Sequence, residues 1–476
     1  MIASLHFAHI PAPAAEKRLV RPVTVTEITV LSKFLAFAVL LFTASVATAQ
    51  TVSPQPPASR SELEVAFDRM ISLGERSQIP WDVKLASPRL RLDQRLEAVI
   101  DVELSHATLN RHAAQHDLIL MVRMSQHDGD WLPGHSRLAK QLDQPLPGRT
   151  TLVFTVRALV VPGSYRVAVL LFDRISGHSS VALRSLRVDP PVPEPLPQAF
   201  RQLPPVEFIH SQEPLEDAML VGAEGRLWLP LKTQRPLHLE LLVNFSHSEE
   251  FMGRGRSSTS DWWSGLRWRW PRMGRRSRPK AEDNLTMILS ALKPLAEMAV
   301  ANGSLRITTL DLGNRKILFE QSDPNPLDWP KLRDALSQFN SNVITADALA
   351  GGKESPAFLR EVLTQRLAPS PAATPELASY SAAQASEAEP AAEEPLRVFI
   401  VLSSAMLFVS GSEVSPVEPF QNCNCRVYYL RLRMLGNIWD QIDDVLDPLK
   451  PRRFDIRSPA DYRSAIAAIL NDLRSL

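Results

Sequence analysis

The apolar run Leu237–Val243 (LHLELLV) restricts the choice of fold because it leads straight into a polar loop. That loop, at positions 244–248, reads NFSHS. A short apolar run of this kind is typical of a strand buried inside a sheet. Open α/β sheets bind their ligands at the carboxyl ends of such strands. The sequence therefore predicts a buried strand with a candidate site at its tip.

Downstream of this run, strand patterns and helix patterns alternate. Alternation of this kind implies a mostly parallel sheet that is covered on both faces. The fold predicted for residues 236–476 is therefore a doubly wound, Rossmann-like α/β sheet. The expected strands are Leu305–Leu312, Ile317–Glu320, Leu396–Leu402 and Arg426–Leu432, and the expected helices are Asp283–Asn302, Trp329–Phe339, Ala346–Leu367 and Ser458–Leu476, the last with Ser458 as its N-cap.

Upstream, short strand patterns recur between turn residues from position 81 to position 189. Regular spacing of this kind favours an antiparallel β-sandwich, and Val161–Val188 looks like the last hairpin of an immunoglobulin-like module. The chain is thus predicted to be multidomain. Residues 50–80 are expected to be a linker with a short helix (Ser61–Arg76), and residues 190–235 a proline-rich linker with edge strands. The expected strands of the sandwich are Leu96–Leu104, Asp117–Met124, Thr150–Val156, Tyr165–Phe172 and Val181–Val188.

The first 49 residues have the layout of a leader and signal peptide. Lys33 precedes the apolar run Phe34–Val46, and the small residues Ala47 and Ala49 follow it. This pattern predicts cleavage after Ala49 and a secreted or periplasmic protein. The run is shorter than the ~20 apolar residues that a membrane-spanning helix needs, and an uncleaved anchor is the alternative.

The order of elements in residues 236–476 resembles a von Willebrand factor A domain of the kind found in Acidobacteria-type secreted proteins. The resemblance rests on a first strand that ends in an x-Ser-x-Ser loop and on a D-A-L segment at 347–349. It implies a metal-ion-dependent adhesion site with Asp-x-Ser-x-Ser on one loop, Thr on a second and Asp on a third.

The residues at the matching positions lack the carboxylates of that site. Ser246 and Ser248 match the two serines, but Asn244 and Ser404 stand where the resemblance implies aspartates. Thr345 is the hydroxyl nearest to the expected threonine position. Because Mg²⁺ and Ca²⁺ prefer carboxylate oxygens, we expect a degenerate site without metal or cofactor.

An insertion at 253–282 combines basic and aromatic residues. Nine basic residues stand against one acid between Gly253 and Lys280. Such a segment could bind lipid headgroups or polysaccharide, or it could be a solvated loop with loosely docked tryptophans. The residues proposed for surface binding are Trp262, Trp263, Arg267, Trp268, Arg269, Trp270, Arg275 and Arg276.

Two further segments carry weaker signals. Cys423 and Cys425, the chain's only cysteines, could form a local disulfide or remain free thiols. The insertion at 368–395 is rich in Ala, Pro, Ser and Glu and is expected to be disordered.

These features together favour a secreted, non-enzymatic protein that binds a partner protein or the cell-envelope surface. The net charge of +1 and the expected secretion argue against nucleic acid as a partner. The sequence lacks the G-x-S-x-G, H-E-x-x-H and phosphate-loop motifs. Ser246 and His247 could suggest a nucleophile and its base, but adjacent residues on a loop seldom point at each other. The alternatives are a metal-dependent adhesin, an envelope-binding protein that uses the Arg/Trp insertion, and an envelope hydrolase.

Overall fold

The computed structural model describes 62–112, 115–127, 129–146, 150–210, 214–220, 223–246, 284–324, 326–337, 354–367, 395–406, 425–432 and 440–476. The chain divides into two compact units, Met1–Val65 and Ala66–Leu476. In the first unit, only the start of helix α2 (Glu62–Ser72) is described. No helix within the described ranges combines the length and apolarity that crossing a membrane requires.

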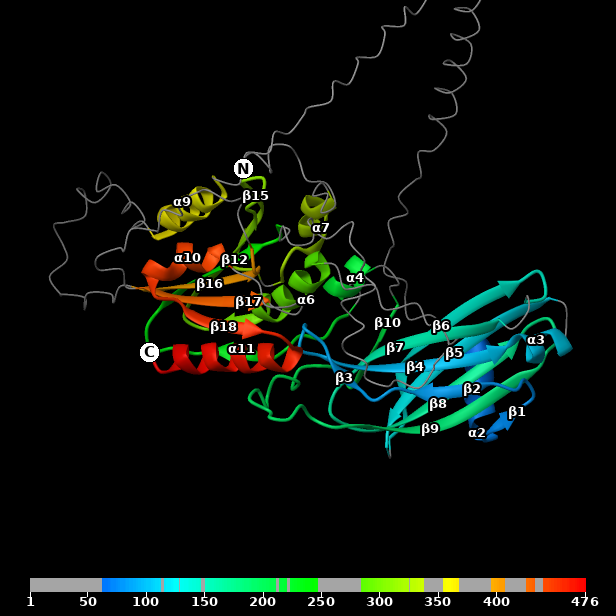
Figure 1. The fold of residues 1–476 in the computed structure, drawn as a ribbon. Coiled ribbons are helices and arrows are strands. Elements are labelled where there is room, and N and C mark those ends of the chain that lie inside the picture. The colour runs from blue at the N-terminus through cyan, green and yellow to red at the C-terminus, as the bar shows by residue number, and fades with distance from the viewer. Residues whose placement is uncertain are drawn as a thin grey trace, which may run out of the picture. The chain divides into compact units, whose positions relative to one another are not determined.

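Two antiparallel sheets form the N-terminal part of the second unit (Figure 1). The first has the order β1 (Arg76–Ser77), β9 (Ser179–Val188), β8 (Gly163–Asp173), β5 (His116–Gln126), β6 (Trp131–Leu142). The second has the order β10 (Val206–Ile209), β7 (Thr151–Val160), β4 (Leu96–Ser105), β2 (Asp82–Leu85), with β3 (Arg89–Leu90) also paired to β4, and helix α3 (His106–His112) follows β4. Alternate residues of both sheets, such as Ile100 and Val122, share one buried cluster.

A mixed six-stranded sheet follows, with β12 (Leu237–Asn244) near its centre. Its order is β15 (Lys316–Ser322), β14 (Gly303–Asp311), β12, β16 (Leu396–Ser404), β17 (Cys425–Leu432), β18 (Arg452–Ile456). The edge strand β15 runs antiparallel to β14, and the other pairs are parallel. The carboxyl ends of β12, β14 and β16 therefore lie side by side.

Helices bury both faces of β12. Leu239 and Leu241 belong to a cluster with residues of α6 (Asn284–Ala296) and α11 (Pro459–Arg474). Leu242 belongs to another cluster with residues of α9 (Ser355–Leu367) and α10 (Gln441–Leu446). Burying a leucine contributes about 2 kcal/mol, which makes this strand costly to displace. The other elements are α4 (Pro214–Met219), α7 (Trp329–Ser337), η3 (Asp447–Leu449) and a parallel pair, β11 (Leu229–Leu231) and β13 (Met298–Val300).

The predicted fold class is wrong for the chain. Of the described residues, 43% lie in strands and 27% in helices, and the sheets other than the short parallel pair β11 and β13 are antiparallel or mixed. The described chain is thus predominantly β, and this replaces the predicted class of a doubly wound, parallel α/β domain of the von Willebrand A type. The reason is physical: short apolar runs indicate burial, but they specify neither the pairing partner nor the strand direction.

Several predicted elements lie at other boundaries. The helix expected over Asp283–Asn302 ends at Ala296, and Met298–Val300 form strand β13 instead. The pairing of β13 with β11 fixes this change, and a long-range partner of this kind leaves no local signal. Gly303, at φ +139°, starts β14 where an added Cβ would lie 1.9 Å from Leu237 O. Only glycine fits there.

The predicted start of the last helix is confirmed. The side chain of Ser458 caps α11 by accepting a hydrogen bond from Asp461 N at 3.2 Å, and Pro459 is the first helical residue. The sequence analysis missed α10 and β18, which are short and rich in charged residues.

Candidate functional site

The polar side chains at the tips of β12, β14 and β16 form one hydrogen-bonded cluster, the strand-end cluster (Asn244, Ser246, Asp311 and Ser403). Asn244 Nδ2 donates to Ser403 Oγ at 3.0 Å, and Asn244 Oδ1 accepts from Ser246 N at 3.0 Å. Ser246 Oγ donates to Asp311 Oδ1 at 3.0 Å. The side chains of all four are buried. The structure thus brings the predicted residues Asn244 and Ser246 together.

The sequence analysis missed the cluster's carboxylate. Asp311 is the last residue of β14 and 3% exposed. Besides Ser246, it accepts hydrogen bonds from Asn314 N at 3.1 Å and Asn314 Nδ2 at 2.6 Å. A signal existed, because Asp311 lies near the end of a predicted strand and the ends of parallel strands meet. Ser403 was missed in the same way, one residue before the predicted Ser404.

These hydrogen bonds decide what the strand-end cluster can do. Ser246 Oγ also accepts from Gly313 N at 2.9 Å, so its oxygen faces protein on both sides. A divalent cation would displace these contacts and would find a single carboxylate. No group of three His, Cys, Asp or Glu side chains suited to a metal occurs in the described residues. The absence of metal nevertheless stays a prediction.

The buried acid Asp440 is hydrogen-bonded to the loop after β16. Asp440 Oδ1 accepts from Met406 N at 3.1 Å, and its Oδ2 accepts from Tyr429 Oη at 2.6 Å. Burial raises the pKa of Asp440, against the opposing effect of these hydrogen bonds. Burial and the neighbouring Asp440 carboxylate likewise raise the pKa of Tyr429. Asp440 therefore fixes the loop and does not face a ligand.

The other predicted site residues fall into two groups. Ser404 is half-buried at the end of β16, and Cys425 begins β17 and is disulfide-bonded. The pairing of Cys425 with Cys423 stays a prediction. Ser248, Thr345, Cys423 and the whole Arg/Trp insertion lie outside the described residues, as do positions 368–394 of the second insertion.

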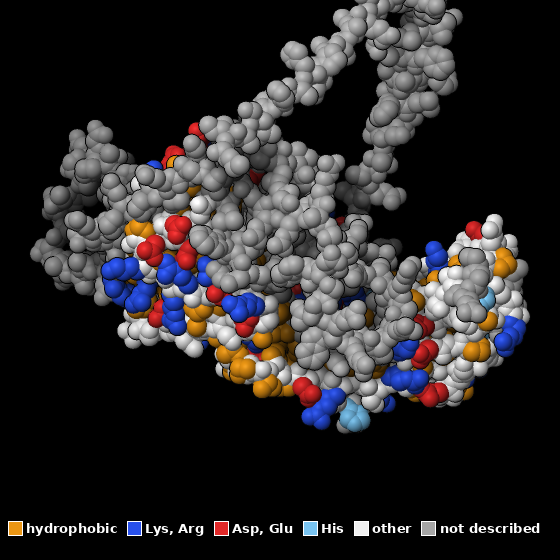
Figure 2. Space-filling view, viewed as in Figure 1, with side chains coloured by type: hydrophobic (Ala, Val, Ile, Leu, Met, Phe, Trp, Pro, Cys, Tyr) orange, Lys and Arg blue, Asp and Glu red, His pale blue; other side chains and the backbone are white. Residues whose placement is uncertain are grey.

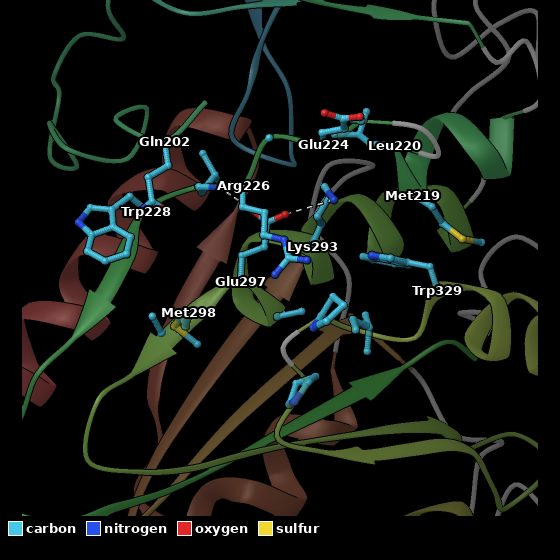
Figure 3. Close-up of a pocket in the computed structure, with 18 of the residues that line it drawn as sticks. Gln202, Met219, Leu220, Glu224, Arg226, Trp228, Lys293, Glu297, Met298 and Trp329 are labelled. Carbon is cyan, nitrogen blue, oxygen red and sulfur yellow. Dashed lines mark hydrogen bonds and ion pairs between the residues drawn. The ribbon is translucent and has the colours of Figure 1, made fainter. Parts of the chain in front are cut away.

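The structure contains a second candidate site, which we call the Trp329 cavity. It has a volume of about 470 Å³ and lies between the segment before β11, the end of α6 and the start of α7 (Figure 3). Its apolar walls include Met219, Trp228, Met298, Pro326 and Trp329, and its charged residues are Glu224, Arg226, Lys293, Glu297 and Arg333.

An internal ion pair fixes the floor of the Trp329 cavity. Lys293 Nζ lies 3.2 Å from Glu297 Oε1 and 5.3 Å from the centre of the Trp329 ring. Glu297 Oε2 accepts from Leu227 N at 2.8 Å, which ties the wall to helix α6 (Figure 3). Both charges are therefore satisfied inside the protein, and the indole ring is held by a cation–π contact.

The lining of the Trp329 cavity combines apolar and charged side chains. The described lining residues include no Ser, Thr, Cys, His or Asp, so none supplies a hydroxyl, thiol or imidazole nucleophile. Arg226 and Arg333 are exposed, and the walls are apolar. Such a cavity suits an apolar group next to an anionic one. The prolines Pro324, Pro326 and Pro330 around Trp329 are a sequence signal for this cavity.

Comparisons with known proteins give no family. No protein-family description and no curated protein matches the chain. Among solved structures, the chain is weakly similar to a β-glucosidase from Listeria innocua (13% identity, TM-score 0.14) over 24% of this chain and 16% of that one.

Two other solved structures are matched over more of the chain. One is Bacteroides uniformis β-glucuronidase 2 covalently bound to cyclophellitol-6-carboxylate aziridine (11% identity, TM-score 0.18), over 83% of this chain and 44% of that one. The other is a glycosyl hydrolase family 2 member from Bacteroides cellulosilyticus DSM 14838 (8% identity, TM-score 0.17), over 79% of this chain and 45% of that one. The chain thus spans less than half the length of these structures, and at these TM-scores the likeness carries no argument about fold or function.

Proposed function

We propose that this chain is a secreted, non-enzymatic binding protein that holds an apolar side chain of a partner protein in the Trp329 cavity. The observation that carries the proposal is the pairing of Lys293 with both Glu297 and Trp329. This arrangement leaves a hollow with apolar walls in which the charges of Lys293 and Glu297 compensate each other.

The cavity is built to receive a ligand without rearranging. Trp329 is half-buried at the start of α7, and the adjacent Pro330 fixes the backbone of the first turn. Leu227, whose backbone bonds Glu297, precedes Trp228 on the opposite wall. A preformed cavity of this kind loses little conformational entropy when it binds.

The commitment of Glu297 argues against an enzyme at this place. Of the two carboxylates in the lining, Glu297 is committed to Lys293 and to Leu227 N. A glycosidase or protease would need a carboxylate pair or a nucleophile with a free base. Secretion rests on the predicted signal peptide. It would be supported if mass spectrometry of the exported protein gave the mass of a chain that starts at Gln50.

Selection of random peptides on the immobilised protein tests the binding function. Peptides that bind the unmodified protein should lose most of their affinity for Trp329→Ala. The matched control is Trp131→Ala, because Trp131 on β6 also has a cation, Arg166, 5.3 Å from its ring centre. Binding to this control should be unchanged.

A second variant guards against misfolding of Trp329→Ala. Ala299 is an exposed residue of β13 that lines the cavity, and Ala299→Trp would fill the hollow without removing a contact. Loss of binding in both cavity variants, with an unchanged unfolding midpoint for Ala299→Trp, supports the proposal. Peptides that bind all variants equally, or a selection that yields no binder, would overturn it.

A further inference from the structure

A second hollow adjoins the Trp329 cavity, and the two share Trp228. We call it the Arg474 groove. It has a volume of about 600 Å³ and lies between the segment Pro195–Arg201, strand β11 and the last turns of α11. Hydrophobic side chains gather near the position of α11 on the visible face of the molecule (Figure 2). Trp228 N donates to Ala199 O at 2.9 Å, which holds the tryptophan between the two hollows.

The charges of the Arg474 groove are all of one sign. Its lining contains Arg201, Lys232 and Arg474, and it contains no Asp or Glu. Arg474 Nη2 donates to Pro230 O at 2.8 Å. Neither Arg201 nor Lys232 forms an ion pair with any described residue.

This imbalance is notable in a chain with 53 basic and 52 acidic residues. A nearby arginine, by contrast, is paired with an acid of the protein itself. Arg463, about three turns before Arg474 on α11, donates to Glu194 Oε1 at 2.8 Å and to Leu196 O at 3.2 Å. The acid closest in sequence to the groove is thereby already compensated. The groove cations remain available for an anion from outside.

The walls of the groove favour an extended polypeptide as the source of that anion. Pro195, Pro197 and Pro230 line it, and prolines are rigid and offer no backbone N–H donors. Polar side chains that could read sugar hydroxyls are scarce, because Gln198 is the one amide among the lining residues. An extended segment advances ~3.3 Å per residue, so neighbouring residues of one peptide can reach both sides of Trp228.

We infer that the Arg474 groove binds the carboxylates of an acidic, extended segment of the partner whose apolar residue enters the Trp329 cavity. This inference rests on the proposed function and adds the chemical class of the partner. Arg201, Lys232 and Arg474 supply the attraction, and Trp228 separates the acidic residues from the apolar one. Ion pairs at such an exposed rim act on specificity and association rate, and they weaken in salt.

Fluorescence anisotropy with two labelled peptides tests the inference. Both peptides have about ten residues and one central Leu; one carries glutamates on a single side of it, and the other carries glutamines there. The double variant Arg201→Glu/Lys232→Glu should bind the glutamate peptide about tenfold more weakly. Its affinity for the glutamine peptide should be unchanged.

The matched control is Arg137→Glu/Lys140→Glu on β6, which changes the net charge by the same amount at two exposed positions. It should bind both peptides as the unmodified protein does. Equal affinity of the groove variant and the control for the glutamate peptide would overturn the inference.

The outcomes separate this inference from the proposed function. Suppose that both peptides bind the unmodified protein, that neither binds Trp329→Ala, and that the groove variant binds both with unchanged affinity. The inference then fails, while the proposed binding function stands. If neither peptide binds, both fail. A third outcome is that the protein binds polygalacturonate and not the glutamate peptide, and that the groove variant binds polygalacturonate more weakly. This would overturn the inference of a peptide ligand and assign the groove to an anionic polysaccharide.

Discussion

The ammonium group of Lys293 lies 5.3 Å from the centre of the Trp329 ring, and its nitrogen lies 3.2 Å from Glu297 Oε1. One buried lysine on α6 thus connects an aromatic wall on α7 with an acid at the end of its own helix. The side chains of Lys293 and Glu297 are 7% and 10% exposed. The shape of the Trp329 cavity therefore depends on a charge pair that water barely reaches.

Replacing Lys293 with methionine should lower the free energy of unfolding by about 3 kcal/mol, because Glu297 would be left as a buried, unpaired charge. Urea-induced unfolding followed by fluorescence measures this. The double variant Lys293→Met/Glu297→Gln should recover most of the loss, since glutamine can still accept from Leu227 N. If the single and double variants were equally stable, the ion pair would have no such role.

Replacing Ser246 with alanine should cost about 2 kcal/mol of stability, because Asp311 loses a donor and Gly313 N loses its acceptor in a buried place. The matched control is Ser464→Ala on α11, whose exposed Oγ donates only to Ala460 O. That change should stay within about 0.5 kcal/mol. Equal effects in the two variants would show that the strand-end cluster is not a stabilising network.

Calorimetric titration with Mg²⁺ or Ca²⁺ should show no binding at micromolar concentrations. Asn244 offers an amide and not a carboxylate, and the one carboxylate of the cluster, Asp311, already accepts hydrogen bonds from Ser246 and Asn314. Micromolar binding that disappears in Ser246→Ala would contradict this and would revive the metal-dependent adhesin.

The carboxylate of Asp173 should make stability depend on acidic pH. Burial on its own raises the pKa of Asp173, but hydrogen bonds from His116, Ser176, Ile175 and Asp117 N outweigh burial and hold the pKa below its usual value. The unfolded chain, with a pKa of about 3.9, therefore binds the proton more tightly. This stabilisation is present above that unfolded pKa and is lost as pH falls through the folded pKa.

A series of urea unfolding curves between about pH 6 and about pH 3 measures this dependence. The unmodified protein should lose more stability across the series than Asp173→Asn, so the difference between the two should shrink as the solution becomes more acidic. A difference that stays constant with pH would exclude Asp173 as a contributor.

The elements that the sequence predicted well are those with local signals. The strand Leu396–Leu402 lies within β16, and Ser458 caps α11 as expected. Periodic apolar residues and capping side chains act over a few neighbouring residues, so they can be read from the chain itself. Boundaries such as the end of α6 at Ala296 depend on a distant partner, here the pairing of β13 with β11.

The sequence by itself determined that residues 237–243 form a buried strand and that Asn244 and Ser246 lie at its tip. The tertiary structure alone decided that the tip meets Asp311 and Ser403, that the described chain is predominantly β, and that Trp228, Lys293 and Trp329 surround one cavity. The physical reason is that burial is encoded residue by residue. The meeting of segments far apart in the chain depends on how the sheets and helices pack.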